Sequence, residues 1–380
     1  MKRRSGPIRV MVVEDSPTAR NLLVTLFNQS GDIQVVGTAL DGVEAVRRAA
    51  ELRPDVITMD VQMPRLNGLE ATRQILQIAP IPIVIVTASL NHPDMDLTFA
   101  AMRAGALSVV KKPGLGEMES CEQVVQTVRL MADVPVVRRW NQERNTRPLH
   151  SVSLPPSQPA SSAAVALASA LPARSVTDSV PSLILRPDQK KPWKMIGIAS
   201  STGGPSALVS SLKPIPADFP LPILVVQHIT RGFAASLAEW LNGELKLTVR
   251  LAEQGEVPVP GTVLISPDDR HMQVSDRGTV LLHSSPPYKG LRPSANYLFY
   301  SLARVYGKLA VGVILTGMGD DGVDGLTELH HQGGMVLAQD EASSVVYGMP
   351  REAAERKVVD HVLPVDRVGQ ALLQITEFGG

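Results

Sequence analysis

Short runs rich in Val and Ile alternate with amphipathic stretches along the first third of the chain. The apolar runs have the length of buried strands and cover residues 8–14, 33–39, 56–60, 81–87 and 107–111. Between them, polar and apolar positions follow a helical spacing, most clearly over residues 42–52 and 117–131. Five such repeats predict an α/β domain in which helices wrap both faces of a five-stranded parallel sheet.

This pattern is lost between residues 132 and 190, where Pro, Ser and Ala dominate. A segment of that composition lacks the large apolar side chains needed to bury a core, so it predicts a flexible linker. We therefore expect two domains, at residues 8–131 and 191–380, joined by a linker at residues 132–190.

The alternating pattern returns after residue 190 and predicts a second, doubly wound α/β domain. Strands are expected at residues 194–200, 222–228, 247–253, 309–317, 335–340 and 359–365. Helices are expected at residues 233–242, 295–306, 323–331 and 368–378. Residues 255–290 suggest short strands and turns instead.

Amino-acid composition limits the cellular location and the partners expected for this chain. Its 380 residues carry 37 basic and 37 acidic side chains, so the basic bias typical of nucleic-acid-binding proteins is missing. The single cysteine, Cys121, excludes an intrachain disulfide and favours a reducing cytoplasm. The apolar run near the start is too short to cross a bilayer. We expect a cytoplasmic protein with no nucleic-acid partner and no direct membrane insertion.

Polar side chains stand where the strands of the first domain end. Glu14 and Asp15 follow the first strand, Asp60 ends the third, Thr87 ends the fourth, and Lys112 follows the fifth. Because parallel sheets place their sites at the carboxyl ends of strands, these groups should converge. Clustered carboxylates repel one another and need a cation, and oxygen ligands suit Mg²⁺. One strand-end acid alone could equally be a helix cap; the full set predicts a phosphoryl-accepting site.

This constellation resembles the receiver domains of two-component signalling, which have a flavodoxin-like fold. The resemblance implies that Glu14, Asp15 and Asp60 hold Mg²⁺ and that Asp60 is phosphorylated by a histidine kinase. It assigns the switch hydroxyl to Thr87 and the invariant lysine to Lys112. Many receivers carry an aromatic side chain at the position of Val109, so the aromatic half of their switch does not carry over.

The second domain also places reactive side chains at strand ends. Residues 200–204, Ser-Ser-Thr-Gly-Gly, follow one expected strand, His228 ends the next, and Asp321 lies in the loop after a later strand. A nucleophile, a base and an orienting acid follow the logic of acyl-transfer hydrolases. The serine turn alone would fit a plain helix cap as well. The order Ser, His, Asp differs from that of ordinary α/β-hydrolases.

A dinucleotide site is an alternative for the same loop. Residues 317–322 fit the spacing G-x-G-x-x-G after a strand, and Asp340 ends the following strand. However, Asp320 and Asp321 would repel a pyrophosphate at this position. The alternative also gives the serine and the histidine no role.

Several segments together resemble the chemotaxis protein-glutamate methylesterases: residues 201–204, 227–228, 266–272, 292–294, 315–322 and 347–352. With the receiver segments, the resemblance covers both domains and leaves out only the linker. It implies that Ser201 is the nucleophile, His228 the base and Asp321 the orienting acid. It also assigns an oxyanion-binding N–H to Met318. Ala199 and Ser200 replace the usual Gly-Ala before the nucleophile.

The resemblance implies hydrolysis of glutamyl methyl esters on methyl-accepting chemoreceptors with release of methanol, and deamidation of receptor glutamines. No cofactor is expected for hydrolysis, and phosphorylation of Asp60 is expected to relieve inhibition by the receiver. Two other classes stay open. A transcriptional regulator would need a basic DNA-binding module, and none is visible in the sequence. A silent receptor-binding adaptor would not need all three triad residues.

Overall fold

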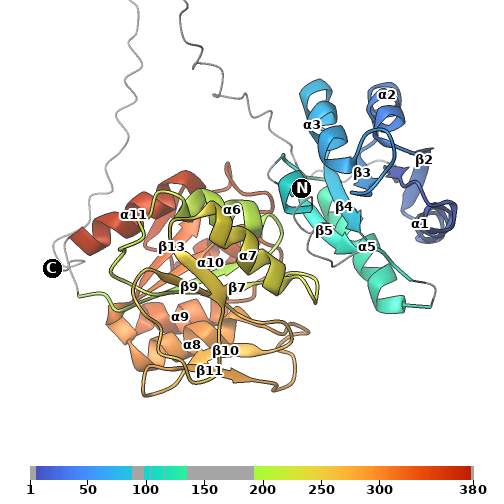
Figure 1. Cartoon of the computed structure of the whole chain (residues 1–380). Helices are drawn as coiled ribbons and strands as arrows, with labels where there is room; N and C mark the ends of the chain where they lie inside the picture. Colours follow the sequence, from blue (N-terminus) through green and yellow to red (C-terminus); the bar gives the residue numbers. More distant parts are fainter. Residues whose placement is uncertain (1–5, 88–97, 103, 115, 135–191, 378–380) are drawn as a thin grey trace, which may run out of the picture. The chain divides into compact units, whose positions relative to one another are not determined.

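The computed structural model describes residues 6–87, 98–102, 104–114, 116–134 and 192–377, which form an N-terminal and a C-terminal α/β region (Figure 1). Residues 135–190 of the expected linker lie outside the described residues. Among the described helices, none is both long and apolar enough to span a bilayer.

The N-terminal region contains a five-stranded parallel sheet with the order β2-β1-β3-β4-β5. Its strands are β1 (Ile8–Val13), β2 (Ile33–Ala39), β3 (Val56–Met59), β4 (Ile83–Thr87) and β5 (Ser108–Lys111). All five agree with the expected strands to within two residues at each end. The strand order reverses between β1 and β3, where a doubly wound sheet opens a crevice for ligands.

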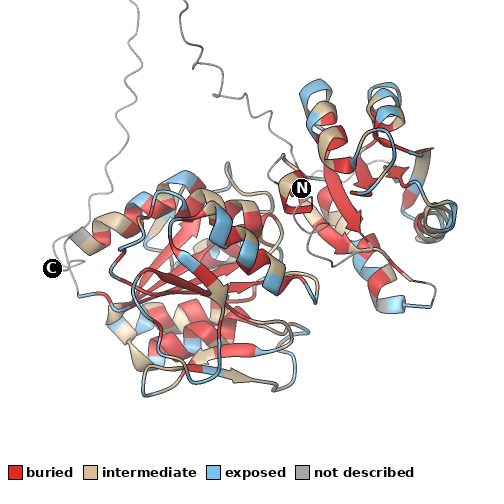
Figure 2. Ribbon diagram, in the orientation of Figure 1, coloured by how far each residue is buried: buried red, intermediate tan, exposed pale blue. Residues whose placement is uncertain are grey.

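This sheet is accompanied by helices α1 (Pro17–Gln29), α2 (Gly42–Leu52), α3 (Gly68–Ile78) and α5 (Met118–Met131), and residues 98–102 are helical as well. Their N-terminal residues explain where two of them begin. The Asp41 side chain accepts hydrogen bonds from the first turn of α2, and Asn67 caps α3 in the same way. Strands β3 and β4 are buried along their whole length, while the outer faces of the helices are exposed (Figure 2).

The C-terminal region contains a seven-stranded parallel sheet with the order β14-β13-β12-β6-β7-β9-β8. Its strands are β6 (Met195–Ser200), β7 (Ile223–Gln227), β8 (Thr248–Leu251), β9 (Thr262–Ile265), β12 (Ala310–Ile314), β13 (Met335–Gln339) and β14 (His361–Leu363). The order reverses between β6 and β12, so this sheet is doubly wound as expected. A separate antiparallel hairpin joins β10 (His271–Val274) to β11 (Val280–His283).

The helices of this region are α6 (Gly204–Leu212), α7 (Ala234–Glu244), α8 (Ala295–Val305), α9 (Val323–His331), α10 (Met349–Glu355) and α11 (Val365–Glu377), with a 3-10 turn at Gly307–Leu309. The sequence pattern missed two features. It did not predict α10, because seven residues are too few to show a helical period. It correctly predicted short strands and turns at 255–290, where β9, β10 and β11 lie, but it did not predict that β9 belongs to the main sheet.

Candidate functional site

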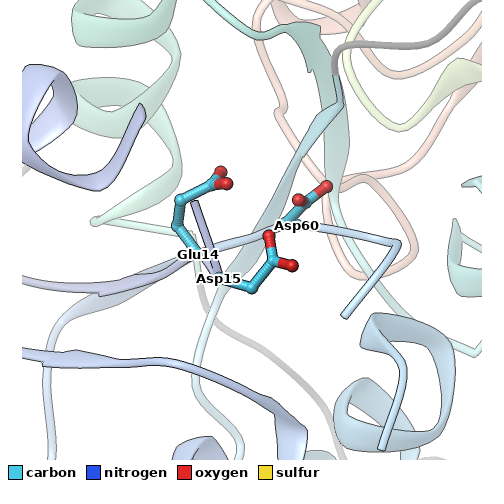
Figure 3. Close-up of side chains that lie close together, drawn as sticks. All are labelled: Glu14, Asp15 and Asp60. Carbon is cyan, nitrogen blue, oxygen red and sulfur yellow. The ribbon is translucent and has the colours of Figure 1, made fainter. Parts of the chain in front are cut away.

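The acidic residues of the N-terminal region converge at the point where its strand order reverses. Glu14 and Asp15 follow β1, and Asp60 follows β3, the strand paired with β1. One carboxylate oxygen from each lies within 4.8 Å of the others. Figure 3 shows the three side chains close together. Asp60 also accepts a hydrogen bond of 2.7 Å from the backbone N–H of Val61. The expected cluster is therefore present as a geometric unit.

Lys112 is the cationic partner of this cluster. Its Nζ lies 2.8 Å from Asp60 Oδ2 and 2.8 Å from Glu14 Oε2. Burial raises the pKa of Glu14, and the charge of Asp60 raises it further. Burial also raises the pKa of Asp60 despite the opposing effect of Lys112. Burial by itself would lower the pKa of Lys112, but the two carboxylates outweigh it and raise that pKa.

The directions of these pKa shifts test whether a cation fits the acidic cluster. Raised carboxylate pKa values mean that one lysine does not fully compensate the negative charge of Glu14 and Asp60. Three carboxylate side chains form the hard-oxygen donor set that Mg²⁺ takes in proteins. The residues therefore fit Mg²⁺. Thr87 ends β4 with its side chain buried, and its carbonyl accepts a hydrogen bond of 2.8 Å from Lys112 N–H.

The candidate hydrolase residues follow three neighbouring strands at the centre of the larger sheet. Ser201 follows β6, His228 follows β7, and Asp321 lies in the loop after β12. The N–H of Ser201 donates to the carbonyl of Thr316, and the N–H of His228 donates to the carbonyl of Ser200. Backbone bonds thus continue past the strand ends and fix the starting points of these segments.

Asp321 is the most heavily bonded of the three. Its carboxylate accepts hydrogen bonds from Ser294 Oγ at 2.5 Å, Ala295 N at 2.6 Å and Asn296 Nδ2 at 2.9 Å. His228 Nε2 lies 2.9 Å from Asp321 Oδ2. Burial alone would raise the pKa of Asp321, but His228 and the hydrogen bonds from Ser294 and Ala295 outweigh burial and lower it. Asp321 is therefore an ionised group held in a fixed orientation beside the histidine.

The two adjacent serines have different environments. Ser200 is fully buried, and its Oγ donates a hydrogen bond of 2.6 Å to Gln227 Oε1. Gln227 Nε2 in turn donates to the carbonyls of Ser201 at 2.8 Å and His228 at 2.7 Å. The Ser200 hydroxyl is thus engaged in a structural network, whereas the Ser201 side chain is only partly buried. The sequence analysis included Gln227 in the motif at residues 227–228 but gave its side chain no role, although a glutamine within an apolar strand is a signal of buried polar bonding.

The glycine loop after β12 lies against the serine turn. A Cβ on Gly317 would come within 2.7 Å of Ser201 Cβ, so only glycine fits there. Met318 follows, half exposed. The geometry also weakens the dinucleotide alternative, because Asp321 is bound to α8. In addition, Asp340 Oδ1 accepts hydrogen bonds from the N–H and the hydroxyl of Ser343 in a local turn.

Comparison with known proteins decides the family. A family model described as CheB methylesterase matches residues 196–372, and a response regulator receiver domain model matches residues 10–123. A protein-glutamate methylesterase/protein-glutamine glutaminase of Nitrosospira multiformis is 42% identical over 373 residues, 97% of each chain. This chain belongs to the CheB methylesterase family. A Myxococcus xanthus member is 45% identical over 351 residues, 91% of each chain.

Solved structures of Thermotoga maritima CheB also match this family member in two pieces. The methylesterase catalytic domain is 38% identical and covers 48% of this chain and 98% of its own, with a TM-score of 0.47. The response regulator domain is 38% identical and covers 34% of this chain and 98% of its own, with a TM-score of 0.32. The expectation of a receiver and a methylesterase domain in one chain, and hence of a hydrolytic enzyme, is confirmed by the family models and relatives.

Proposed function

We propose that this enzyme hydrolyses glutamyl methyl esters on methyl-accepting chemoreceptors, releasing methanol, and deamidates selected receptor glutamines. The observation that carries the proposal is the 2.9 Å approach of His228 Nε2 to the buried Asp321 carboxylate. The two residues follow β7 and β12, the strands on either side of β6 and its Ser201 turn. A histidine paired with a fixed, ionised acid is the base that a serine nucleophile needs. The names of the relatives support the same reaction.

In the proposed reaction, Ser201 Oγ attacks the ester carbonyl while His228 takes the hydroxyl proton. The resulting oxyanion accepts a hydrogen bond from the backbone N–H of Met318. His228 then returns the proton to the departing methoxide, which leaves as methanol, and Ser201 is left as an acyl ester. Water attacks this ester, His228 again takes and returns a proton, and the product is glutamate with free Ser201. With glutamine as substrate, ammonia leaves instead of methanol.

Asp321 contributes by stabilising the transient positive charge of His228. Its lowered pKa keeps it ionised throughout the pH range in which histidine can act as a base. A carboxylate bound by several donors also cannot rotate freely, so it holds the imidazole in one orientation. Hydrolysis by these side chains requires no cofactor.

The receiver site is proposed to take a phosphoryl group from a histidine kinase onto Asp60. Glu14, Asp15 and Asp60 would hold Mg²⁺, which neutralises the negative charge that accompanies phosphoryl transfer. Lys112 already lies 2.8 Å from the acceptor carboxylate and would pair with the phosphoryl oxygens. The Thr87 hydroxyl is proposed to bind the phosphoryl group.

Phosphorylation is proposed to control hydrolysis through a division of the chain into a receiver at 8–131, a linker at 132–190 and a catalytic domain at 191–380. The unphosphorylated receiver inhibits the catalytic domain, and phosphorylation of Asp60 relieves this inhibition. Because the linker makes the interaction intramolecular, even a weak contact can inhibit.

The test compares initial rates of methanol release from methylated chemoreceptor membranes for three proteins at equal concentration. These are the full chain, its Asp60→Asn variant and the fragment 190–380, each with Mg²⁺ and a small phosphodonor. The full chain should be activated, Asp60→Asn should stay at the basal rate, and the fragment should exceed that basal rate. No methanol release by any of them would refute the proposed reaction, whereas equal rates in all three would refute only the proposed control.

A further inference from the structure

The N-terminus of α8 is aimed at the carboxylate of Asp321. Three consecutive residues, Ser294, Ala295 and Asn296, each donate one hydrogen bond to it, and all three are fully buried. The N-terminal end of an eleven-residue helix also carries a partial positive charge that stabilises an anion. Helix α8 therefore both binds Asp321 and favours its ionised form.

His271 fixes the backbone where these donors begin. Its Nδ1 accepts a hydrogen bond of 3.1 Å from the N–H of Ser294, and its Nε2 lies 3.2 Å from the carbonyl of Pro286. Since Nδ1 is an acceptor, the neutral ring carries its proton on Nε2 and donates it to that carbonyl. His271 is fully buried, and its ring centroid lies 4.1 Å from that of Tyr297 and 5.2 Å from that of His283.

The charges around His271 favour this neutral form. Burial lowers its pKa, and the nearby His283 and Arg292 lower it further. Together these effects exceed those of the hydrogen bond to the Pro286 carbonyl and of the charge of Asp321, which both raise it. A protonated ring would direct an N–H of Nδ1 against the N–H of Ser294 and break that bond. The imidazole on β10 therefore holds two positions of the loop between β11 and α8.

We propose that His271 and Ser294 are positioning residues for hydrolysis, acting through Asp321 on His228. His271 holds the backbone of Ser294, and this directs the Ser294 hydroxyl proton to Asp321 Oδ1. The carboxylate is thereby kept in the orientation that faces His228. This inference rests on the proposed role of Asp321 in the triad.

A plain helix cap would not need this arrangement. As a cap, Ser294 uses its oxygen as an acceptor, and Asn296 N–H donates to it at 3.3 Å. The bond to Asp321 uses the hydroxyl as a donor, at the shorter distance of 2.5 Å. The donor and acceptor roles can therefore be tested separately from helix stability.

The kinetic test compares Ser294→Ala with Ser301→Ala in the full chain. Ser301 is a matched control, because it lies on the same helix, is also buried, and its hydroxyl also bonds the backbone, to Val274 and Leu298. We expect Ser294→Ala to lower kcat for methanol release by about 10-fold to 100-fold with KM within about twofold of wild type. Ser301→Ala should change kcat by less than about threefold.

A second measurement does not depend on activity. Losing the Ser294 donor leaves more negative charge on Asp321 to face His228, so the pKa of His228 should rise. An NMR titration of labelled histidines, with His228 assigned from a His228→Gln variant, should show this rise in Ser294→Ala and not in Ser301→Ala. The acidic limb of the pH profile of kcat/KM should move to higher pH by the same amount.

Two further variants complete the test. Ser294→Thr keeps a hydroxyl and should recover most of kcat, whereas His271→Phe keeps an aromatic ring and should lose kcat as Ser294→Ala does. The inference is overturned if Ser294→Ala leaves the His228 titration unchanged, if Ser301→Ala matches it, or if a folded Ser294→Thr recovers nothing. Failure of wild type to release methanol would instead refute the proposed function, and the titration would still decide the positioning role.

Discussion

The receiver and the methylesterase domain both place buried carboxylates where a parallel sheet reverses its strand order, but they treat those carboxylates in opposite ways. In the receiver, Glu14 and Asp60 face each other with one lysine between them, and their pKa values are raised. In the methylesterase domain, Asp321 accepts three hydrogen bonds beside His228, and its pKa is lowered.

The contrast shows that sheet topology determines where a site lies, whereas the hydrogen-bond donors around its carboxylates determine its chemistry. A carboxylate with too few donors retains negative charge that a cation or a phosphoryl donor can use. A carboxylate saturated by donors is fixed and ionised, so it can orient a neighbouring base without itself reacting. The receiver cluster has the charge and donor set to take up a cation, whereas the charge of Asp321 is already compensated by groups of the chain itself.

The largest expected effect concerns the site of the methylesterase domain. Ser201→Ala should lower the esterase rate by about 10⁴-fold to 10⁶-fold with an unchanged fold, because the proposed nucleophile is lost. Ser200→Ala should retain most of the rate, since its hydroxyl is bound to Gln227. Methanol release and circular dichroism measured on both variants check this, and an inactive Ser200→Ala beside an active Ser201→Ala would move the nucleophile to Ser200.

Neutralising one buried carboxylate in each site should change the free energy of unfolding in opposite directions. Asp321→Asn leaves buried donors without an anionic acceptor and should lower the free energy of unfolding by about 1–3 kcal/mol. Glu14→Gln removes a repelled carboxylate and, without Mg²⁺, should raise it by about 1 kcal/mol. Urea unfolding of the full chain at neutral pH, with each domain's transition followed separately, measures both. Destabilisation by Glu14→Gln would show that Lys112 already compensates the cluster.

The pH dependence of these effects follows from the pKa directions. Because folding raises the pKa of Glu14 and Asp60, their contribution to stability is present below the ordinary values of 4.5 and 3.8 and falls as pH rises through the raised values. Asp321 has a lowered pKa, so its contribution is present above 3.8 and is lost as pH falls through that lowered value.

Mg²⁺ competes with protons for the receiver cluster, so its affinity should fall as pH decreases through the raised pKa values. Titration calorimetry at a series of pH values above 4.5, the ordinary pKa of Glu14, should show this loss beginning at higher pH than an ordinary carboxylate would give. The Asp60→Asn variant is the control and should bind weakly at every pH. A pH-independent affinity across that series would contradict the raised pKa values.

The last prediction is that the chain does not bind a dinucleotide. The glycine loop at residues 317–322 supports the site of the methylesterase domain, and its Asp321 is engaged with α8. Calorimetric titration of the full chain with NAD or NADP should therefore give no heat of binding. Micromolar affinity for NAD or NADP would support the dinucleotide-binding alternative. It would also contradict the contrast between the two sites, because this loop would then also depend on a bound ligand.

The sequence by itself determined the elements and most of the reactive residues. Val- and Ile-rich runs located every strand of the receiver sheet. The reason is clearest for β3 and β4, which are buried throughout, because burial on both faces favours a nearly continuous apolar run. Motifs at strand ends singled out Glu14, Asp60, Ser201, His228 and Asp321, because such motifs can be recognised from neighbouring residues in the sequence. Their catalytic and switch roles stay predictions until the variants above are measured.

Only the tertiary structure decided which groups complete each site. The donors to Asp321 lie 25 to 27 positions before it in the chain. The motif at residues 292–294 includes one of them, Ser294, but nothing in the sequence pattern shows that its partner is Asp321. The sheet order that sets β6 between β7 and β12, and the bond from Ser200 to Gln227, depend equally on packing between distant segments. Periodicity along a chain reports which side of an element is buried, whereas the partner of a buried polar atom is fixed only when separate elements pack together.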